Sequence, residues 1–468
     1  MRKPVVFIPG YPGSDLWVSP SDWKLFPPPF AGLSVAHRRE LIARLSGPDD
    51  PEVEDGVSSR EVITGLRVAG LPIMKEAETL YRTLRAAGYT LGEDLRTVPW
   101  DWRLPVDHHE TLDLAAFAIR ELAQAYGSRV VVMAHSTGGL VLRALLERRS
   151  PQEASELAGR IERVLALGVP WAGTLKTLRY IGIGSRALIF SASEMQTVIG
   201  HSWAAYDLMP PDPAHTDMTD PDGDLNLFVD EAGRQTSPFA HLTATGPRHV
   251  QMRATAADRK SRGRTKQIVV AGSAIPVVNV AGWGAPTDTC FRIQRGGRAM
   301  RPDASMKHAD QGDGTIPYRS AAWLSGPSVV TFPVPIGLYE GFIPATHSQI
   351  WETPPAKEII QNVLADRPLP ALITAAVDHE QVFARRRYVD IRISAFDEEG
   401  RPLPATARFA PQAGQRSRPV TLQEGRGTLS YEVGARPSSG RFLCPVIVTW
   451  RSSGGEERVV HLQRYFYW

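Results

Sequence analysis

Cysteine is scarce in this chain, with only two residues in 468, Cys290 and Cys444. Two cysteines so far apart in sequence cannot form a disulfide framework, so the fold does not require an oxidising compartment. The first apolar run, Val5–Ile8, is too short for the core of a signal peptide, and no small-residue cleavage site follows it. The sequence therefore predicts a cytoplasmic location.

Long apolar runs and a strong charge of one sign are also missing. No stretch of about 18 apolar residues occurs, so we expect no transmembrane helix. The formal net charge is only +3, which gives no argument for a nucleic-acid partner. Hydrophobic residues make up 43% of the chain, which is ordinary for a globular protein of more than one domain.

Strand and helix patterns alternate over residues 1–369. Apolar runs at 5–8 and 164–167 predict buried strands, and apolar spacing at 74–87 and 112–126 predicts helices. This alternation favours an α/β fold with a mostly parallel, doubly wound sheet. Two segments, 14–59 and 180–264, are too long for plain connections, so we expect them to form cap or lid insertions above the sheet. We find no internal repeat.

A different pattern follows from about residue 385 to residue 468. Apolar and polar residues alternate, as in Tyr388-Val389-Asp390-Ile391-Arg392-Ile393, and turn residues separate the runs. Period-two alternation is typical of strands with one buried face. We therefore expect a small antiparallel β-sandwich as a second domain.

The candidate nucleophile is Ser136. The apolar run before it ends abruptly at the serine, and a helical pattern begins directly after it. This strand–turn–helix context predicts a nucleophile elbow, which exposes the serine Oγ at the carboxyl edge of a sheet. The turn admits only small neighbours, and Ala134 and Gly138 take those places. A serine in this turn needs a histidine to accept its proton.

Triad order in α/β-hydrolases places an acid and then a histidine after the serine. Asp313 lies in a glycine-rich turn and is the candidate acid, with Asp310 as the second choice. The histidine that follows is His347; later in the chain come only His379 and His461. We therefore predict that His347 is the base.

An oxyanion hole needs two backbone N–H donors directed at the developing charge. The residue after the nucleophile, Thr137, supplies one of them in this fold. The other comes from the loop after the first core strand, where Tyr11 is the candidate because Pro12 has no N–H.

These stretches, in this order, resemble the lecithin:cholesterol acyltransferase and lysosomal phospholipase A2 family. The motifs that carry the resemblance span about residues 4–365 and are Val6-Phe7-Ile8-Pro9-Gly10, Val98-Pro99-Trp100-Asp101-Trp102-Arg103, Ala134-His135-Ser136-Thr137-Gly138-Gly139, Leu167-Gly168-Val169-Pro170-Trp171-Ala172-Gly173, Gly312-Asp313-Gly314-Thr315 and His347. The resemblance implies an α/β-hydrolase fold and a Ser136–Asp313–His347 triad. It also implies a structural role for Trp102 and Arg103 beneath the site.

The chain departs from the family in two places. Eukaryotic members close a membrane-docking subdomain with a disulfide near the position of residues 14–59, where this chain has no cysteine. The β-domain is an addition to the family's core. We therefore expect a bacterial-type member without the lid disulfide, and contact with a lipid surface stays open.

The resulting hypothesis is a serine lipase, esterase or O-acyltransferase that cleaves an ester of a hydrophobic acyl chain, such as a phospholipid, through an acyl-enzyme on Ser136. The alternatives are a small-ester carboxylesterase or amidase of the same fold, and a non-catalytic binding protein that works through its β-domain. We expect no cofactor and no metal, because the calcium-loop pattern at 220–231 lacks its glycine at the required position. Head group, acyl acceptor and oligomeric state stay open.

Overall fold

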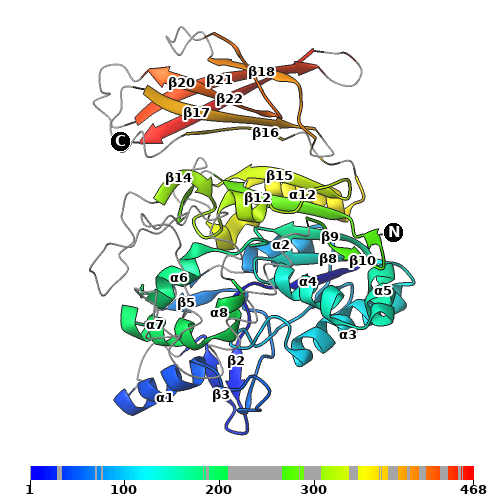
Figure 1. The fold of residues 1–468 in the computed structure, drawn as a ribbon, viewed down its shortest axis with the longest axis vertical. Helices are drawn as coiled ribbons and strands as arrows, with labels where there is room; N and C mark the ends of the chain where they lie inside the picture. Colours follow the sequence, from blue (N-terminus) through cyan, green and yellow to red (C-terminus); the bar gives the residue numbers. More distant parts are fainter. Residues whose placement is uncertain are drawn as a thin grey trace, which may run out of the picture.

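The computed structural model describes residues 2–28, 34–68, 71–74, 77–182, 184–185, 189–208, 266–283, 285–288, 307–336, 346–367, 369, 372–377, 388–397, 401–409, 418–432, 441–451, 455 and 457–467. Figure 1 shows an α/β body with a separate layered β-domain at one end. Within the described residues, no helix is both long and apolar enough to span a membrane.

The α/β body is built on a six-stranded sheet in the order β15-β12-β9-β8-β1-β7. All five neighbouring pairs are parallel. In chain order the strands are β1 (Val5–Ile8), β7 (Leu95–Thr97), β8 (Val130–His135), β9 (Ile161–Leu167), β12 (Val277–Trp283) and β15 (Val329–Pro335). The β-branched residues of the four inner strands are buried on both faces, as is usual for parallel sheets, whereas Val329 and Val330 on the edge strand β15 are partly exposed.

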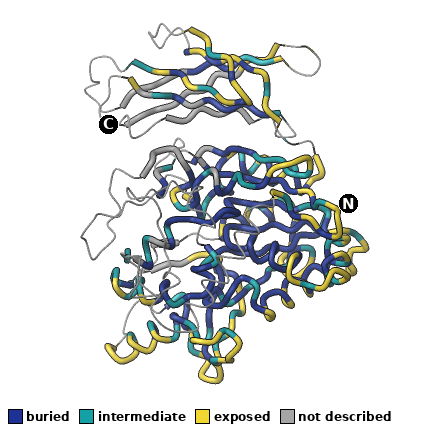
Figure 2. Tube along the Cα trace, in the orientation of Figure 1, coloured by how far each residue is buried: buried dark blue, intermediate teal, exposed yellow. Residues whose placement is uncertain are grey.

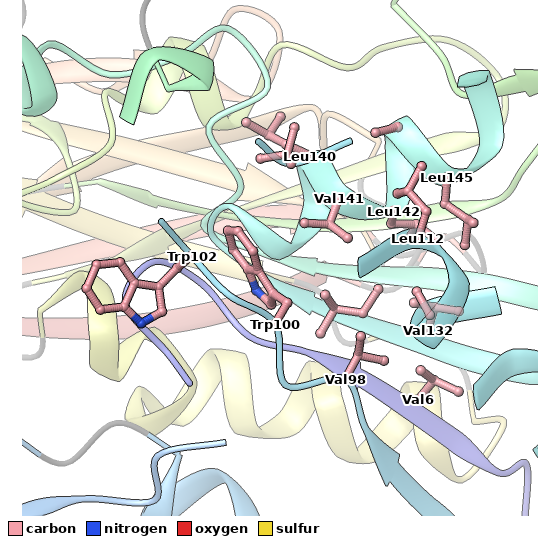
Figure 3. Close-up of a cluster of buried hydrophobic side chains, with 14 of the residues drawn as sticks. Val6, Val98, Trp100, Trp102, Leu112, Val132, Leu140, Val141, Leu142 and Leu145 are labelled. Atoms are coloured by element: carbon pink, nitrogen blue, oxygen red, sulfur yellow. The ribbon is translucent and has the colours of Figure 1, made fainter. Parts of the chain in front are cut away.

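Helices cover both faces of this sheet (Figure 1). One face packs against α3 (His109–Tyr126), α4 (Gly138–Arg148) and α5 (Pro151–Arg160), and Figure 3 shows Val6, Val132, Leu112 and Leu142 meeting in that layer. The other face packs against α2 (Glu78–Ala86) and α12 (Pro354–Leu364). Buried residues concentrate between these layers (Figure 2). The predicted α/β-hydrolase fold is thus confirmed.

The first insertion follows β1. It contains the antiparallel strands β2 (Leu16–Val18), β3 (Trp23–Phe26) and β4 (Val57–Ser58), and the helix α1 (Val35–Leu45). A hairpin of β5 (Leu66–Val68) and β6 (Leu71–Met74) comes next. The helix predicted to start at residue 74 therefore starts later, at Glu78, because Met74 ends a strand.

The second insertion follows β9. Its described part consists of α6 (Leu175–Gly182), α7 (Ala192–His201) and α8 (Trp203–Asp207). Most of the predicted cap at 180–264 lies outside the described residues. Where the two insertions meet, Arg38 Nε donates to Glu194 Oε1 at 2.6 Å and so ties α1 to α7.

Short elements carry the chain from the second insertion back to the sheet and past the predicted acid. They are β10 (Val269–Val270), β11 (Ser273–Ala274), β13 (Ala285–Asp288), β14 (Lys307–Gly312), α11 (Tyr318–Ala321) and the 3₁₀ helix η3 (His347–Glu352).

The C-terminal domain has two antiparallel sheets, ordered β16-β17-β20 and β19-β18-β21-β22, around a small apolar core of their own. The strands are β16 (Leu372–Val377), β17 (Tyr388–Phe396), β18 (Ala405–Phe409), β19 (Val420–Thr421), β20 (Arg426–Glu432), β21 (Arg441–Arg451) and β22 (Glu457–Tyr467). The predicted β-sandwich is therefore present, but it starts before residue 385, because β16 pairs with β17 along its whole length. The Arg426 guanidinium lies over the Tyr318 ring, 4.9 Å from its centroid, and joins the two domains beside the acid loop.

Candidate active site

Ser136 lies in the sharp turn between β8 and α4. Its φ is +50°, a strained conformation for a residue with a Cβ, and its N–H donates to the carbonyl of Leu167 at 3.0 Å. A Cβ on Gly138 would come within 2.3 Å of the Ile8 carbonyl oxygen, and one on Gly10 within 2.7 Å of the Ser136 Cβ. Strand, helix and loop thus approach so closely that only glycine fits at both positions.

Ser136, His347 and Asp313 form one hydrogen-bonded chain. The Ser136 hydroxyl donates to His347 Nε2 over 2.8 Å, and His347 Nδ1 donates to Asp313 Oδ2 over 2.6 Å. All three residues are buried. This arrangement fixes the imidazole tautomer with a free Nε2 lone pair facing the hydroxyl, as a general base requires.

Asp313 is held by the loop that contains it. Its Oδ1 accepts the N–H groups of Thr315 and Ile316 at 3.0 and 2.7 Å. These bonds leave Oδ2 for the histidine. The second-choice acid, Asp310, lies within β14. Of the other histidines, His461 lies in β22 of the β-domain and His379 lies outside the described residues.

His135 is a residue of this site to which the sequence assigned no role. Its ring packs on His347 at 4.9 Å and on Trp351 at 4.6 Å between centroids. Its Nε2 donates to the His347 carbonyl at 3.2 Å. Burial and the neighbouring His347 lower the pKa of His135 well below its usual value, so the ring stays neutral. His135 is part of the motif around Ser136, but its contact with His347 becomes visible only in the fold.

Gly168 lies directly behind the triad. Its φ is +58°, and a Cβ there would lie 3.1 Å from His347 Cε1 and 3.2 Å from Asp313 Oδ2. The glycine after β9 therefore leaves the room that the His347–Asp313 pair occupies.

A cavity of about 440 Å³ opens beside Ser136 and His347. Most of its walls come from the two insertions, through the apolar side chains of Phe26, Leu45, Phe190, Met195, Val198 and Leu208. Of the aromatic residues in the first insertion, Phe26 reaches the cavity, whereas Phe30 lies outside the described residues. Lys176 adds a cation at the wall, where its Nζ donates to Thr315 Oγ1 at 2.8 Å.

The two predicted oxyanion donors, Tyr11 and Thr137, both line this cavity with Ser136. Among the described residues, no backbone hydrogen bond is recorded for either N–H, so both donors stay available to a ligand. Burial raises the pKa of the Tyr11 hydroxyl, which keeps it neutral beside the apolar wall.

Trp102 and Arg103 support the cavity from below. The Trp102 ring contacts Tyr11 and Phe26 edge to face, and its Nε1 donates to the Ser14 carbonyl at 3.0 Å. Arg103 is fully buried and forms ion pairs with Asp55 and Asp101, each at 2.6 Å. Burial disfavours its charge, but the two carboxylates outweigh burial, and the pKa of Arg103 is raised. Arg103 thereby anchors the first insertion.

The sheet order, the elbow and the hydrogen-bonded triad define the class of the molecule as an α/β-hydrolase. Residues 51–243 match the family model of lecithin:cholesterol acyltransferase. The match confirms the family resemblance that the motifs predicted. It includes Ser136 and ends before Asp313 and His347.

Two curated relatives illustrate this similarity. The lysosomal phospholipase A and acyltransferase of Rattus norvegicus is 38% identical over 107 residues, which cover 23% of this chain and 25% of that protein. The phosphatidylcholine-sterol acyltransferase of Mus musculus is 37% identical over 108 residues, which cover 23% of this chain and 24% of that protein. The aligned part thus spans about a quarter of the length of these relatives.

Two solved structures are similar in part. One is the Tle4–Tli4 complex, with a TM-score of 0.47 and 14% identity over 76% of this chain and 96% of that one. The other is the mature form of Bacillus licheniformis lipase BlEst2, with a TM-score of 0.32 and 11% identity over 75% of this chain and 86% of that one.

Proposed function

We propose that this protein is a serine-dependent lipase, esterase or O-acyltransferase that acts on esters of hydrophobic acyl chains. The observation that carries this proposal is the triad at the wall of an apolar cavity. Triad geometry supports nucleophilic attack on a carbonyl, and the apolar walls support burial of a hydrocarbon chain. Of the two curated relatives, one is named a phospholipase A and acyltransferase and the other a phosphatidylcholine-sterol acyltransferase, and both names agree with this chemistry.

The residues supply each step of such a reaction. His347 Nε2 takes the proton of Ser136 as its Oγ attacks the ester carbonyl, and the imidazolium is stabilised by Asp313. The N–H groups of Tyr11 and Thr137 stabilise the oxyanion. His347 then protonates the departing alcohol. In the second half of the reaction His347 takes a proton from water or from an acceptor alcohol, which attacks the acyl carbonyl, and returns that proton to Ser136 Oγ as the acyl group leaves.

A phospholipid or a similar lipid is the substrate class that we favour. It would reach the cavity from a lipid surface, so transient contact with a membrane is part of the proposal. A carboxylesterase for small esters is the second candidate, since it needs the same triad and differs in how the cavity is used. A binding protein that works only through its β-domain has no need of an aligned triad.

Acyl-chain dependence tests this proposal. Each methylene buried in the cavity contributes up to ~0.8 kcal/mol, or about fourfold in kcat/KM. We therefore expect kcat/KM on p-nitrophenyl esters to rise from acetate to octanoate, below micelle formation. The Ser136→Ala variant should be inactive on every ester, and a fluorophosphonate probe should label the wild type at Ser136.

A cavity-filling variant provides the matched comparison. Met195→Trp places a large ring at the cavity wall and should lower kcat/KM on octanoate by about tenfold while acetate is little affected. Thr197→Trp adds the same ring to an exposed position of the same helix and should leave kcat/KM unchanged on both octanoate and acetate. A steady fall from acetate to octanoate in the wild type would instead favour the small-ester enzyme. Added alcohol that captures the acyl group would distinguish transfer from hydrolysis.

A further inference from the structure

Three side chains that commonly bind metal ions gather where the first insertion meets the start of α3. Glu52 lies in the loop between α1 and β4, His108 directly precedes α3, and His109 is its first residue. One potential ligand atom from each lies within 4.8 Å of those of the other two. None of the three lines the cavity beside Ser136.

His108 is held in the form that a metal ion requires. The residue is buried, and its Nε2 lies 3.1 Å from the Pro51 carbonyl oxygen. A carbonyl can only accept, so Nε2 carries the proton and Nδ1 keeps its lone pair. Among the described residues, this buried Nδ1 has no hydrogen-bond partner. Histidines that bind zinc usually donate their other N–H to a carbonyl or carboxylate, as His108 does here.

The other two side chains already have a spacing that suits a metal. His109 Nδ1 and Glu52 Oε2 are 3.4 Å apart. A tetrahedral zinc ion with bonds of about 2.0–2.1 Å separates its ligand atoms by roughly 3.3–3.4 Å. The rings of His108 and His109 lie 4.5 Å apart, and the side chains of His109 and Glu52 are exposed. Small rotations of these two exposed side chains would bring all three ligand atoms to bonding distance of one metal ion.

The sequence predicted no metal, but on this geometry we propose that Glu52, His108 and His109 form a binding site for a divalent transition-metal ion, with zinc as the best fit. Two imidazoles and a carboxylate suit zinc, whereas calcium and magnesium prefer ligand sets made only of oxygen. The positive end of the α3 dipole opposes a cation at this place, and the charge of the Glu52 carboxylate offsets it. Water completes the coordination.

The ion would link the loop of the first insertion to the α/β body. Because it binds the folded state only, it raises the stability of the protein in proportion to its occupancy. This role concerns the attachment of the insertion and is separate from the ester chemistry of Ser136.

Calorimetric titration with zinc chloride tests the site on the full-length protein after removal of metals with EDTA. The informative variants are His109→Asn and Glu52→Gln, since both residues are exposed and neither change disturbs the core. The control is His37→Asn, an exposed histidine elsewhere in the same insertion.

We expect the wild type and the control to bind zinc at one site that both informative variants weaken by at least about tenfold. Saturating zinc should raise the midpoint of thermal unfolding of the wild type by at least about 2 °C, with a smaller rise in the variants. Excess magnesium or calcium should not displace the zinc. The proposal is overturned if zinc binding is undetectable in the micromolar range, or if stoichiometry and affinity are the same in both variants as in the wild type.

Discussion

At the scale of single residues, the site depends on the positions where a side chain would not fit. Ser136 takes a positive φ, and Gly10, Gly138 and Gly168 leave space for the groups around it. The strain at Ser136 holds its hydroxyl toward His347 before any ligand arrives. Such preorganisation places the reacting atoms without further rearrangement.

The Asp313 carboxylate should be essential because it fixes the His347 tautomer. Asp313→Asn should lower kcat by roughly 10³–10⁴ while the fold is kept. The matched control is Asp310→Asn, three residues earlier in β14, which should leave kcat within about twofold of the wild type. Steady-state kinetics on one ester measures both. A silent Asp313→Asn beside a damaging Asp310→Asn would contradict the assignment of the acid.

Gly168→Ala should disturb the triad through contact as well as through the backbone. The new methyl group would press on His347 and Asp313, and we expect kcat to fall by about tenfold. Gly127→Ala is the matched control, because it has a similar φ of +55° and open space around the added Cβ. Both variants should lose about 1 kcal/mol of unfolding free energy, so equal kcat values would show that the contact has no effect.

At the scale of elements, the two insertions hold each other. Helix α1 and helix α7 are joined by Arg38 and Glu194, and Glu194 also caps α7, since its side chain accepts the N–H of Ser191. Hydrogen bonding from Arg38 lowers the pKa of Glu194 to about 2. An ionic contact therefore joins the two helices that contribute Leu45 and Met195 to the cavity wall.

The stabilisation by Glu194 should depend on pH in one direction. A carboxyl with a lowered pKa in the folded state stabilises above its unfolded value of about 4.3, and this stabilisation is lost as pH falls toward 2. Thermal unfolding of wild type and Glu194→Gln should therefore differ most above about pH 5, by at most about 1 kcal/mol because the pair is partly exposed. The two curves should converge near pH 2. If the difference in unfolding free energy between wild type and Glu194→Gln grew as pH falls, the lowered pKa of Glu194 would be contradicted.

The sequence predicted the elements with strong periodicity and missed those that depend on distant contacts. Strand β8 and helix α4 are rich in apolar residues, so their own sequences predict that they are buried. Helix α1 buries only Leu41 and Leu45, too few apolar positions for a clear period. The order Ser136, Asp313, His347 could be predicted from chain order, but the contact of His135 with His347 joins residues 212 positions apart. No local pattern encodes such a contact.

At the scale of the whole molecule, two structural units meet beside the acid loop. The β-domain has its own core, and Arg426 reaches Tyr318, five residues after Asp313. We continue to propose a cytoplasmic location for the chain. Cys444 lies in β21, and Cys290 lies outside the described residues.

Reductant should leave the protein unchanged. Cys290 precedes the β-domain and Cys444 lies within it, so neither domain can contain an internal disulfide. Ester hydrolysis and the midpoint of thermal unfolding should therefore be the same with and without dithiothreitol. The comparison is made on one preparation, with the protein lacking both cysteines (Cys290→Ser with Cys444→Ser) as the reference. A lower midpoint in reductant that the double variant does not show would reveal a disulfide.

The walls of the cavity come mostly from the segments that follow β1 and β9. The nucleophile and the acid lie directly after β8 and β14, and the base is the first residue of η3. Substitutions can therefore change the cavity walls without changing the catalytic residues. A lineage could acquire a new preference for its substrate by altering α1, α6 and α7, while the reacting groups pass unchanged from ancestor to descendant. The same separation gives a protein engineer a modular route to new specificity.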